Sequence, residues 1–116
     1  MPRQLRQTKP STKDIDEIWD YTSRTHSVEQ ADEYLRLLDQ AFRDIEREPE
    51  RPSSRPRLDL GNRIRSYHIA LSKERSGTGV KSPRHVVIYR VQDDDLIVVL
   101  RVLHDAMEPG YHLSDE

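Results

Sequence analysis

Basic and aromatic side chains in the second half of the chain are the residues that could do chemistry, and the reaction they suggest is metal-free RNA cleavage. That reaction needs a group that takes the 2′-hydroxyl proton, an acid for the leaving oxygen, and cations for the developing charge. Arg65, Arg90, Arg101, His104 and Tyr111 could supply these roles. Arg101 and His104 lie three residues apart on one expected strand, and regular strand geometry points such residues to opposite faces. This spacing argues against a joint catalytic site.

The histidine and glycine positions predict neither a metal site nor a nucleotide site. The five histidines, at positions 26, 68, 85, 104 and 112, are not paired with one another or with carboxylates at ligand spacing on a helix, and the chain has no cysteine. Gly77 and Gly79 stand in the string SGTGVK, which no expected strand and helix flank in the way a phosphate-binding loop requires. We therefore expect no metal and no cofactor.

Charge is divided unequally along the chain. Residues 11–50 carry a net charge of −7 and residues 51–104 a net charge of +6, in a chain whose net charge is −2. The basic half could meet an acidic partner, either nucleic acid or an acidic protein segment. Alternatively, the two halves could simply attract each other.

Length and hydropathy predict one domain without a membrane span. The chain has 116 residues, of which 34% are hydrophobic, so we expect a single core and one domain over residues 1–116. The first residues are polar, and the longest apolar run, LIVVL, is far shorter than the thickness of a bilayer. These features predict a cytoplasmic protein that does not bind membranes.

The stretch from His85 to His104 predicts a β-hairpin at the centre of the sheet. Its apolar runs, HVVIYRV and LIVVLRVL, flank a turn at residues 92–95, and neither run alternates cleanly between apolar and polar residues. Residues 64–71 predict a strand that leads into this hairpin through a polar excursion, residues 72–84, which we expect to be a mobile surface loop. The residues before Pro10 could form a short edge strand, and residues 49–63 read as a loop.

A first helix is expected to begin near Ser11 and Thr12, which can cap it. Ile15, Ile18 and Trp19 then recur at helical spacing and define its inner face. We interpret Trp19 as a core residue and not as a ligand-stacking residue, because it lies on this same stripe.

A second, longer helix is expected between Ser27 and Pro49. Ser27 followed by Gln30 is a capping box, and Pro49 cannot continue a helix. Its apolar stripe is wider than one sheet contact needs, so the extra width could seat against the first helix or be offered to a partner. The fold predicted is α+β: an N-terminal strand and an antiparallel helical hairpin packed on a small, mainly antiparallel sheet.

The sequence resembles the ParE toxins of the ParE/RelE superfamily, which belong to bacterial type II toxin-antitoxin modules. The resemblance covers about residues 3–107 and is carried by IWDY, EQADEYL, IYRV and RVLH. It implies a toxin that inhibits DNA gyrase, is not an enzyme and is neutralised by a ParD-like antitoxin. The alternatives are a ribosome-dependent mRNA endoribonuclease of RelE type, with Arg65, Arg90, Arg101 and His104 as its catalytic residues, and a non-toxic relic that only binds the antitoxin.

The resemblance also implies two sets of binding residues. We expect the target to contact Arg101, His104 and Met107. We expect the antitoxin to contact the wide helical stripe and two basic strand residues: Tyr34, Leu37, Leu38, Ala41, Phe42, Ile45, Arg65 and Arg90. No direct, specific binding of nucleic acid by the toxin alone is expected.

Overall fold

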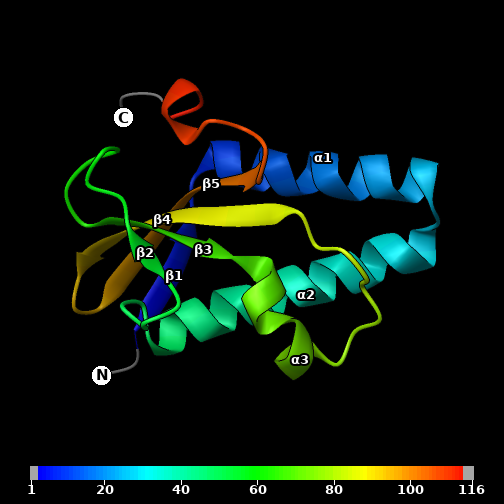
Figure 1. The fold of residues 1–116 in the computed structure, drawn as a ribbon, viewed down its shortest axis with the longest axis horizontal. Helices are drawn as coiled ribbons and strands as arrows, with labels where there is room; N and C mark the ends of the chain where they lie inside the picture. The colour runs from blue at the N-terminus through cyan, green and yellow to red at the C-terminus, as the bar shows by residue number, and fades with distance from the viewer. Residues whose placement is uncertain (1–2, 114–116) are drawn as a thin grey trace.

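A helical hairpin covers one face of a five-stranded sheet in the computed structural model, which describes residues 3–113 (Figure 1). The strand order is β1-β5-β4-β3-β2; β1 is parallel to β5, and the other neighbouring strands are antiparallel. The strands are β1 (Gln4–Gln7), β2 (Arg55–Pro56), β3 (Ile64–His68), β4 (His85–Asp93) and β5 (Leu96–His104). The helices are α1 (Lys9–Thr25), α2 (Val28–Arg47) and α3 (Lys73–Ser76), with 3-10 turns η1 (Ile69–Ser72) and η2 (Pro109–Tyr111). This arrangement confirms the predicted α+β fold.

The predicted hairpin lies at the centre of the sheet. β4 pairs with β3 and β5, and β5 pairs with β4 and β1, which fits the apolar composition of both strands. In the turn, Asp93 Oδ1 accepts a hydrogen bond from the Asp95 backbone N–H (2.8 Å), the local bond that favours Asp in turns. The register shifts twice: Ile88 pairs with Arg101 while Tyr89 pairs with Val99, and a second shift lies between Val91 and Asp93. The strands are therefore continuous but not regular.

The first helix begins earlier than its sequence indicates. Thr8 is the N-cap, and its side-chain oxygen accepts from the Ser11 backbone N–H (3.2 Å). Pro10 lies in the first turn of α1, where no intrahelical N–H donor is needed. The predicted start at Ser11 and Thr12 was wrong, since Ser11 is buried and its hydroxyl donates to the Thr8 carbonyl (2.9 Å).

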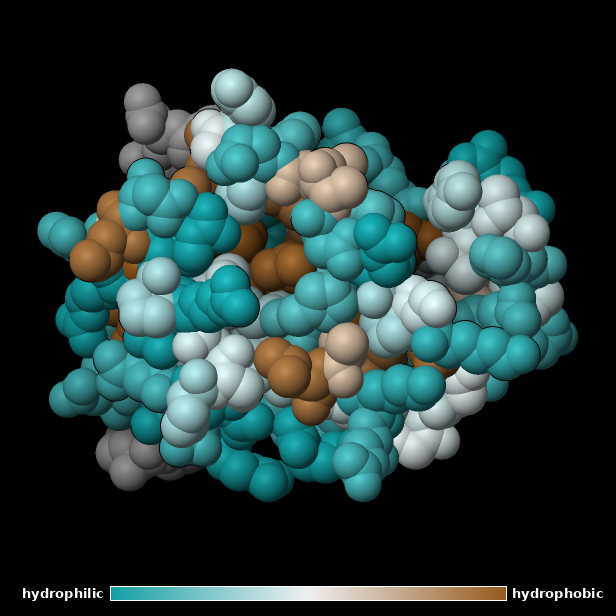
Figure 2. Space-filling view, in the orientation of Figure 1, coloured by the Kyte–Doolittle hydropathy of each residue, from teal (hydrophilic) through white to brown (hydrophobic). Residues whose placement is uncertain are grey.

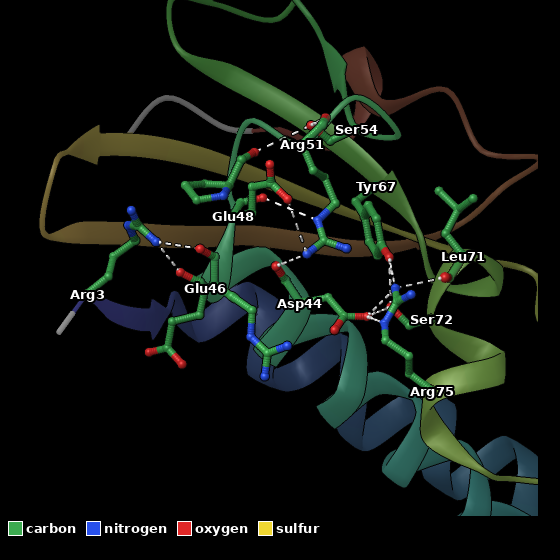
Figure 3. Close-up of polar contacts among 12 residues, drawn as sticks. Arg3, Asp44, Glu46, Glu48, Arg51, Ser54, Tyr67, Leu71, Ser72 and Arg75 are labelled. Atoms are coloured by element: carbon green, nitrogen blue, oxygen red, sulfur yellow. Dashed lines mark hydrogen bonds and ion pairs between the residues drawn. The ribbon is translucent and has the colours of Figure 1, made fainter.

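The second helix follows its predicted bounds. Ser27 Oγ accepts from the Gln30 backbone N–H (3.0 Å), which confirms the capping signal. At the other end, α2 stops at Arg47, and Arg3 Nη1 donates to the Arg47 carbonyl (3.0 Å), one of the carbonyls that a helix leaves unpaired (Figure 3). The N-terminal strand is thereby tied to the end of α2.

The wide stripe of α2 packs inside the protein itself. Leu37, Leu38, Ala41 and Ile45 are at most 2% exposed and pack in the core between the helices and the sheet. Trp19 does not join them: it is only partly buried, and its indole N–H donates to Asp32 Oδ1 (3.0 Å) on α2. The prediction that Trp19 is a core residue was wrong, because its polar edge holds the two helices together at their surface.

The excursion over residues 72–84 is folded onto α2, contrary to the mobile loop that its composition predicts. The strand before it ends at His68, and η1 and α3 follow. The Glu33 carboxylate accepts from the Gly79 backbone N–H, and the Tyr34 hydroxyl accepts from the Arg84 backbone N–H (3.1 Å). Both acceptors belong to α2, so the excursion is held along this helix.

A buried carboxylate makes the strongest of these ties. Asp44 on α2 is 1% exposed and accepts from Arg75 Nη2 (2.7 Å), Gln40 Nε2 (3.0 Å) and the Ser72 hydroxyl, which also bonds to the Tyr67 hydroxyl (2.8 Å) (Figure 3). Burial alone would raise the pKa of Asp44, but the bonds from Arg75, Ser72 and Gln40 outweigh it and lower the pKa. The carboxylate is therefore ionised and fully bonded in the folded protein.

Removal of this carboxylate is expected to loosen the excursion. Asp44→Ala breaks the bonds to Ser72, Arg75 and Gln40 and should lower the free energy of unfolding by about 2 kcal/mol. Urea unfolding and limited trypsin digestion within residues 72–84 measure the two effects. The control Asp39→Ala removes only an exposed pair with Arg43 on the same helix, so a change below about 0.5 kcal/mol is expected. Unaltered digestion of the Asp44→Ala excursion would contradict the role of the network.

Candidate functional site

A cleft of about 800 Å³ opens on the sheet face that the helical hairpin leaves uncovered. We call it the sheet cleft. In Figure 2 apolar surface is recessed near the centre of the view, over the region that Figure 1 labels β4, with polar side chains around it. Its floor comes from β3, β4 and β5, and its walls from the β2 segment, η1 and the residues after β5. The lining residues are Pro52, Ser53, Arg55, Arg57, Ser66, His68, Ala70, Leu71, Val86, Ile88, Leu103, His104, Asp105, Met107 and Pro109.

A second cleft, of about 540 Å³, lies between α1 and the end of β5. We call it the helix cleft. It is lined by Asp14, Glu17, Ile18, Tyr21, Thr22, His85, Arg101, Val102, Leu103, His104, Met107 and His112. Leu103, His104 and Met107 line both clefts, so these three residues form a wall between them.

Arg101 lies at the edge of β5 and is paired with a buried carboxylate. β1 ends at Gln7, opposite Val99, so among residues 3–113 no strand neighbours the rest of β5 on that side. Asp14 takes the place of a strand: it accepts from the Val102 backbone N–H (2.9 Å) and from Arg101 Nε (2.7 Å) and Nη2 (2.8 Å). These bonds raise the pKa of Arg101. The pair fixes α1 to the sheet, and this gives Arg101 a structural role.

Asp105 ties three segments together beside the shared wall. Its carboxylate accepts from Arg84 Nε (3.0 Å) and Nη2 (2.9 Å) and from His68 Nε2 (3.0 Å). The bonds from Arg84, and next those from His68, hold the pKa of Asp105 well below its ordinary range. His68 Nδ1 accepts from the Ala70 backbone N–H (3.1 Å), so the proton of the neutral ring is on Nε2. The ends of β3, β4 and β5 are therefore joined at this carboxylate.

Two histidines face each other across the hairpin at the same end of the sheet. His85 and His104 are register partners, and their rings meet edge to face with centroids 5.6 Å apart. The Tyr34 hydroxyl, which accepts from the Arg84 backbone N–H, is also hydrogen-bonded to His85 Nδ1 (2.6 Å). Burial, and next the charge of His104, lower the pKa of His85 to about 4. His85 is therefore neutral near pH 7 and packs as an uncharged side chain.

This shift predicts acid sensitivity of the fold. The folded protein has the lower His85 pKa, so the unfolded chain binds more protons between about pH 4 and pH 6.5, and stability is lost as the pH falls through this window. When the pH is lowered from about 7.5 to 5, the shifted pKa of His85 should reduce the free energy of unfolding by about 2 kcal/mol. The measurement is urea unfolding of the wild type and of His85→Gln at both pH values. Equal pH dependence of the two proteins would contradict this assignment, because the two proteins differ only at position 85.

The structure brings the three predicted target-binding residues together. Arg101, His104 and Met107 all line the helix cleft. Strand alternation predicts that the side chains of Arg101 and His104 are separated, and this prediction was wrong. The Arg101 guanidinium lies at the strand edge, bonded to Asp14, and not on a face of the sheet.

The predicted antitoxin-binding residues are divided between the interior and the surface. Leu37, Leu38, Ala41 and Ile45 are buried in the core, so their side chains cannot touch a partner of the folded chain, while Tyr34 and Phe42 are partly buried. Arg65 donates to Ser54 Oγ (2.8 Å) and pairs with Tyr89, whose side chain packs on the helix side of the sheet. Arg90 pairs with Ile64, which packs on the other side.

The residues named for a nuclease are not assembled into one site. Arg65 and Arg90 lie on opposite faces of the sheet, as their strand partners show, and Arg101 is committed to Asp14. Only His104 of this set lines the sheet cleft. Tyr111 is 87% exposed on η2 and lines neither cleft.

Sequence reasoning missed the residues that form the cleft rims. Tyr21 in the helix cleft is 64% exposed, and Leu71 in the sheet cleft is 45% exposed. Their signal was available in part: Tyr21 follows the expected inner face of the first helix at Ile18 and Trp19, and Leu71 ends the predicted strand over residues 64–71. Asp14 and Asp105 had no such signal, because their cationic partners are distant in sequence.

Within residues 3–113, no group of three or more His, Asp or Glu side chains is placed to hold a metal ion. Over the same residues, no helix combines the length and the apolar composition that a bilayer-spanning segment needs.

Comparison with known proteins gives concordant results. A family described as the ParE toxin of type II toxin-antitoxin system, parDE, matches residues 5–109. Toxin ParE1 of Mycobacterium tuberculosis H37Rv is 32% identical over 100 residues, which cover 85% of this chain and 86% of the relative. Toxin ParE1 of Caulobacter vibrioides is 31% identical over 109 residues, 94% and 96% of the two chains. A chain from the chromosomal ParDE TA system of P. aeruginosa has the same fold, with a TM-score of 0.67 at 16% identity, covering 89% of this chain and 96% of that one.

Proposed function

The chain belongs to the ParE toxin family of type II toxin-antitoxin systems, and from this membership we propose that it inhibits DNA gyrase and is neutralised by a ParD-like antitoxin. Its action on gyrase is by binding and not by hydrolysis, and it takes place in the cytoplasm. The antitoxin proposal is supported by the ParDE description of the family and of the structural neighbour.

The observation that carries the gyrase proposal is the helix cleft. Met107 and Tyr21 are 46% and 64% exposed at its rim, and Arg101, His104 and His112 lie beside them. Half-exposed apolar and aromatic side chains around a concave surface are typical of the central residues of protein–protein interfaces. The cleft is therefore suited to seat a side chain of a target protein, and it presents Met107 and Tyr21 as the anchoring contacts.

The test is a supercoiling assay with purified gyrase. The toxin alone is expected to stop supercoiling, and addition of the antitoxin encoded beside it is expected to restore it. Expression without antitoxin should produce filamentous cells and DNA-damage signalling. Normal supercoiling in an excess of folded toxin would sink the proposal.

The same experiments separate the two alternatives. A RelE-type ribonuclease would leave supercoiling intact and cut messenger RNA within codons soon after induction, which mapping of mRNA ends detects. A relic would bind the antitoxin, leave supercoiling intact and allow growth on unrestrained expression. Arg65, Arg90 and Arg101 are separated in the structure. This separation argues against a shared catalytic site and against a shared RNA-binding site.

A further inference from the structure

We infer that the sheet cleft receives an acidic protein segment with apolar anchors, and that this segment blocks the helix cleft by packing on the wall that both clefts share. On the proposed function, on which this inference rests, the segment belongs to the antitoxin. It would then neutralise the toxin from the face of the sheet opposite to the helical hairpin.

The first support is a surplus of positive charge at and beside the sheet cleft. Within residues 3–113, Arg55 at the cleft wall has no carboxylate within ion-pair distance, and the same holds for Arg63 and Arg90. Arg57 is paired with Asp59, which is 58% exposed, and also lies within reach of the Glu108 charge, while Asp105 is already committed to Arg84 and His68. A partner segment that carries carboxylates can therefore gain ion pairs here without displacing those inside the protein.

Strand register places Arg90 on this same face. Arg90 is opposite Ile64 on β3 and Val98 on β5, and both of these side chains pack in the apolar cluster on the side away from the helices. Arg63 directly precedes Ile64, and its carbonyl accepts from the Val91 backbone N–H (2.9 Å). Arg90 thus adds a positive charge on this face of the sheet, outside the cleft.

The second support is apolar surface at opposite rims of the cleft. Leu71 on η1 is 45% exposed, and Met107 after β5 is 46% exposed. Val86 lies between them on the floor and is only partly buried. A cleft of about 800 Å³ with such rims can seat one or two large side chains of a protein segment. Apolar anchors between Leu71 and Met107, and carboxylates toward Arg55 and Arg57, define the chemistry of the occupant.

The third support is the shared wall. Met107 and His104 line both clefts, and methionine is flexible enough to pack on either side. An occupant of the sheet cleft that packs on Met107 removes one of the two exposed apolar contacts of the helix cleft, the other being Tyr21. Occupation of the two clefts is therefore competitive, although they open on different sides of β5.

The direct test uses two labelled peptides and measures their binding by fluorescence anisotropy. Both peptides carry leucines at helical spacing; one has glutamate at the remaining positions and the other has lysine. The glutamate peptide is expected to bind the wild-type chain and the lysine peptide is not, and added salt should weaken the binding. Arg55→Glu and Leu71→Asp should each weaken it at least about tenfold.

Matched controls lie on α2, on the opposite side of the sheet. Arg36→Glu reverses an exposed charge, and Val28→Asp replaces an apolar side chain that is 51% exposed. Neither residue lines the sheet cleft or the helix cleft, so binding of the glutamate peptide should change less than about twofold. Circular dichroism of all four variants confirms that each is folded, which is expected because all four side chains are exposed.

Three outcomes would overturn the inference: no binding of the glutamate peptide, equal binding of both peptides, or equal effects of the cleft and control variants. A fourth outcome is that the wild-type chain sediments as a dimer and the Arg55→Glu variant as a monomer. The occupant of the sheet cleft would then be the acidic helical half of a second copy of this chain. The assay contains no gyrase. Intact supercoiling would therefore refute the proposed function alone, and a negative peptide result beside inhibited gyrase would refute this inference alone.

Discussion

Arg101→Ala is expected to lose about 3–5 kcal/mol of unfolding free energy, because it leaves the Asp14 carboxylate buried without its cation. Asp14 is 8% exposed and is bonded to both Arg101 and the Val102 backbone N–H, so the substitution leaves only the Val102 bond and weakens the attachment of α1 to the edge of β5. Thermal and urea unfolding measure the loss. Any loss of toxicity in this variant would then follow from unfolding and would not identify a target contact.

Two controls isolate the buried pair. Arg24→Ala removes an exposed i,i+4 pair with Asp20 on the same helix and should cost less than about 1 kcal/mol. Asp14→Asn combined with Arg101→Met removes both charges, so it should recover part of the stability that the single variant loses. A folded, stable Arg101→Ala protein that no longer inhibits gyrase would reverse this reading and make Arg101 part of the target surface.

The parts of the fold that were predicted correctly depend on signals within a few residues. The Asp93–Asp95 turn and the Ser27 cap of α2 each follow from one short string, and the observed bonds are the ones these residue types favour. The start of α1 was missed for a related reason. The sequence prediction places the boundary between strand and helix at Pro10, although the first turn of a helix tolerates proline.

The parts that were missed depend on partners far apart in sequence. Asp44 meets Arg75 from 31 residues away, and this pair folds the excursion whose composition alone indicates a loop. Asp14 meets Arg101 from 87 residues away and moves that side chain from a strand face to the strand edge. Local periodicity carries no information on such pairs. It also could not show that the wide stripe of α2 fills the protein's own core.

Three aspartate substitutions at exposed side chains should separate the two clefts in function. Tyr21 lines only the helix cleft, Leu71 only the sheet cleft, and Met107 both. Loss of a central apolar anchor costs about 2 kcal/mol or more at an interface, so effects of at least about tenfold are expected. Inhibition of supercoiling and binding of the antitoxin are measured for each variant.

The expected pattern is specific to the shared wall. Tyr21→Asp should lose inhibition of gyrase and keep antitoxin binding, whereas Leu71→Asp should inhibit gyrase as the wild type does but escape neutralisation. Met107→Asp should lose both, because its side chain belongs to both clefts. If Met107→Asp instead behaves like only one of the other two variants, the clefts act separately and the antitoxin blocks gyrase in another way. Tyr21→Asp and Leu71→Asp are expected to keep the wild-type fold, since each of these side chains is 45% exposed or more. The loss of one activity with the other intact therefore cannot come from unfolding.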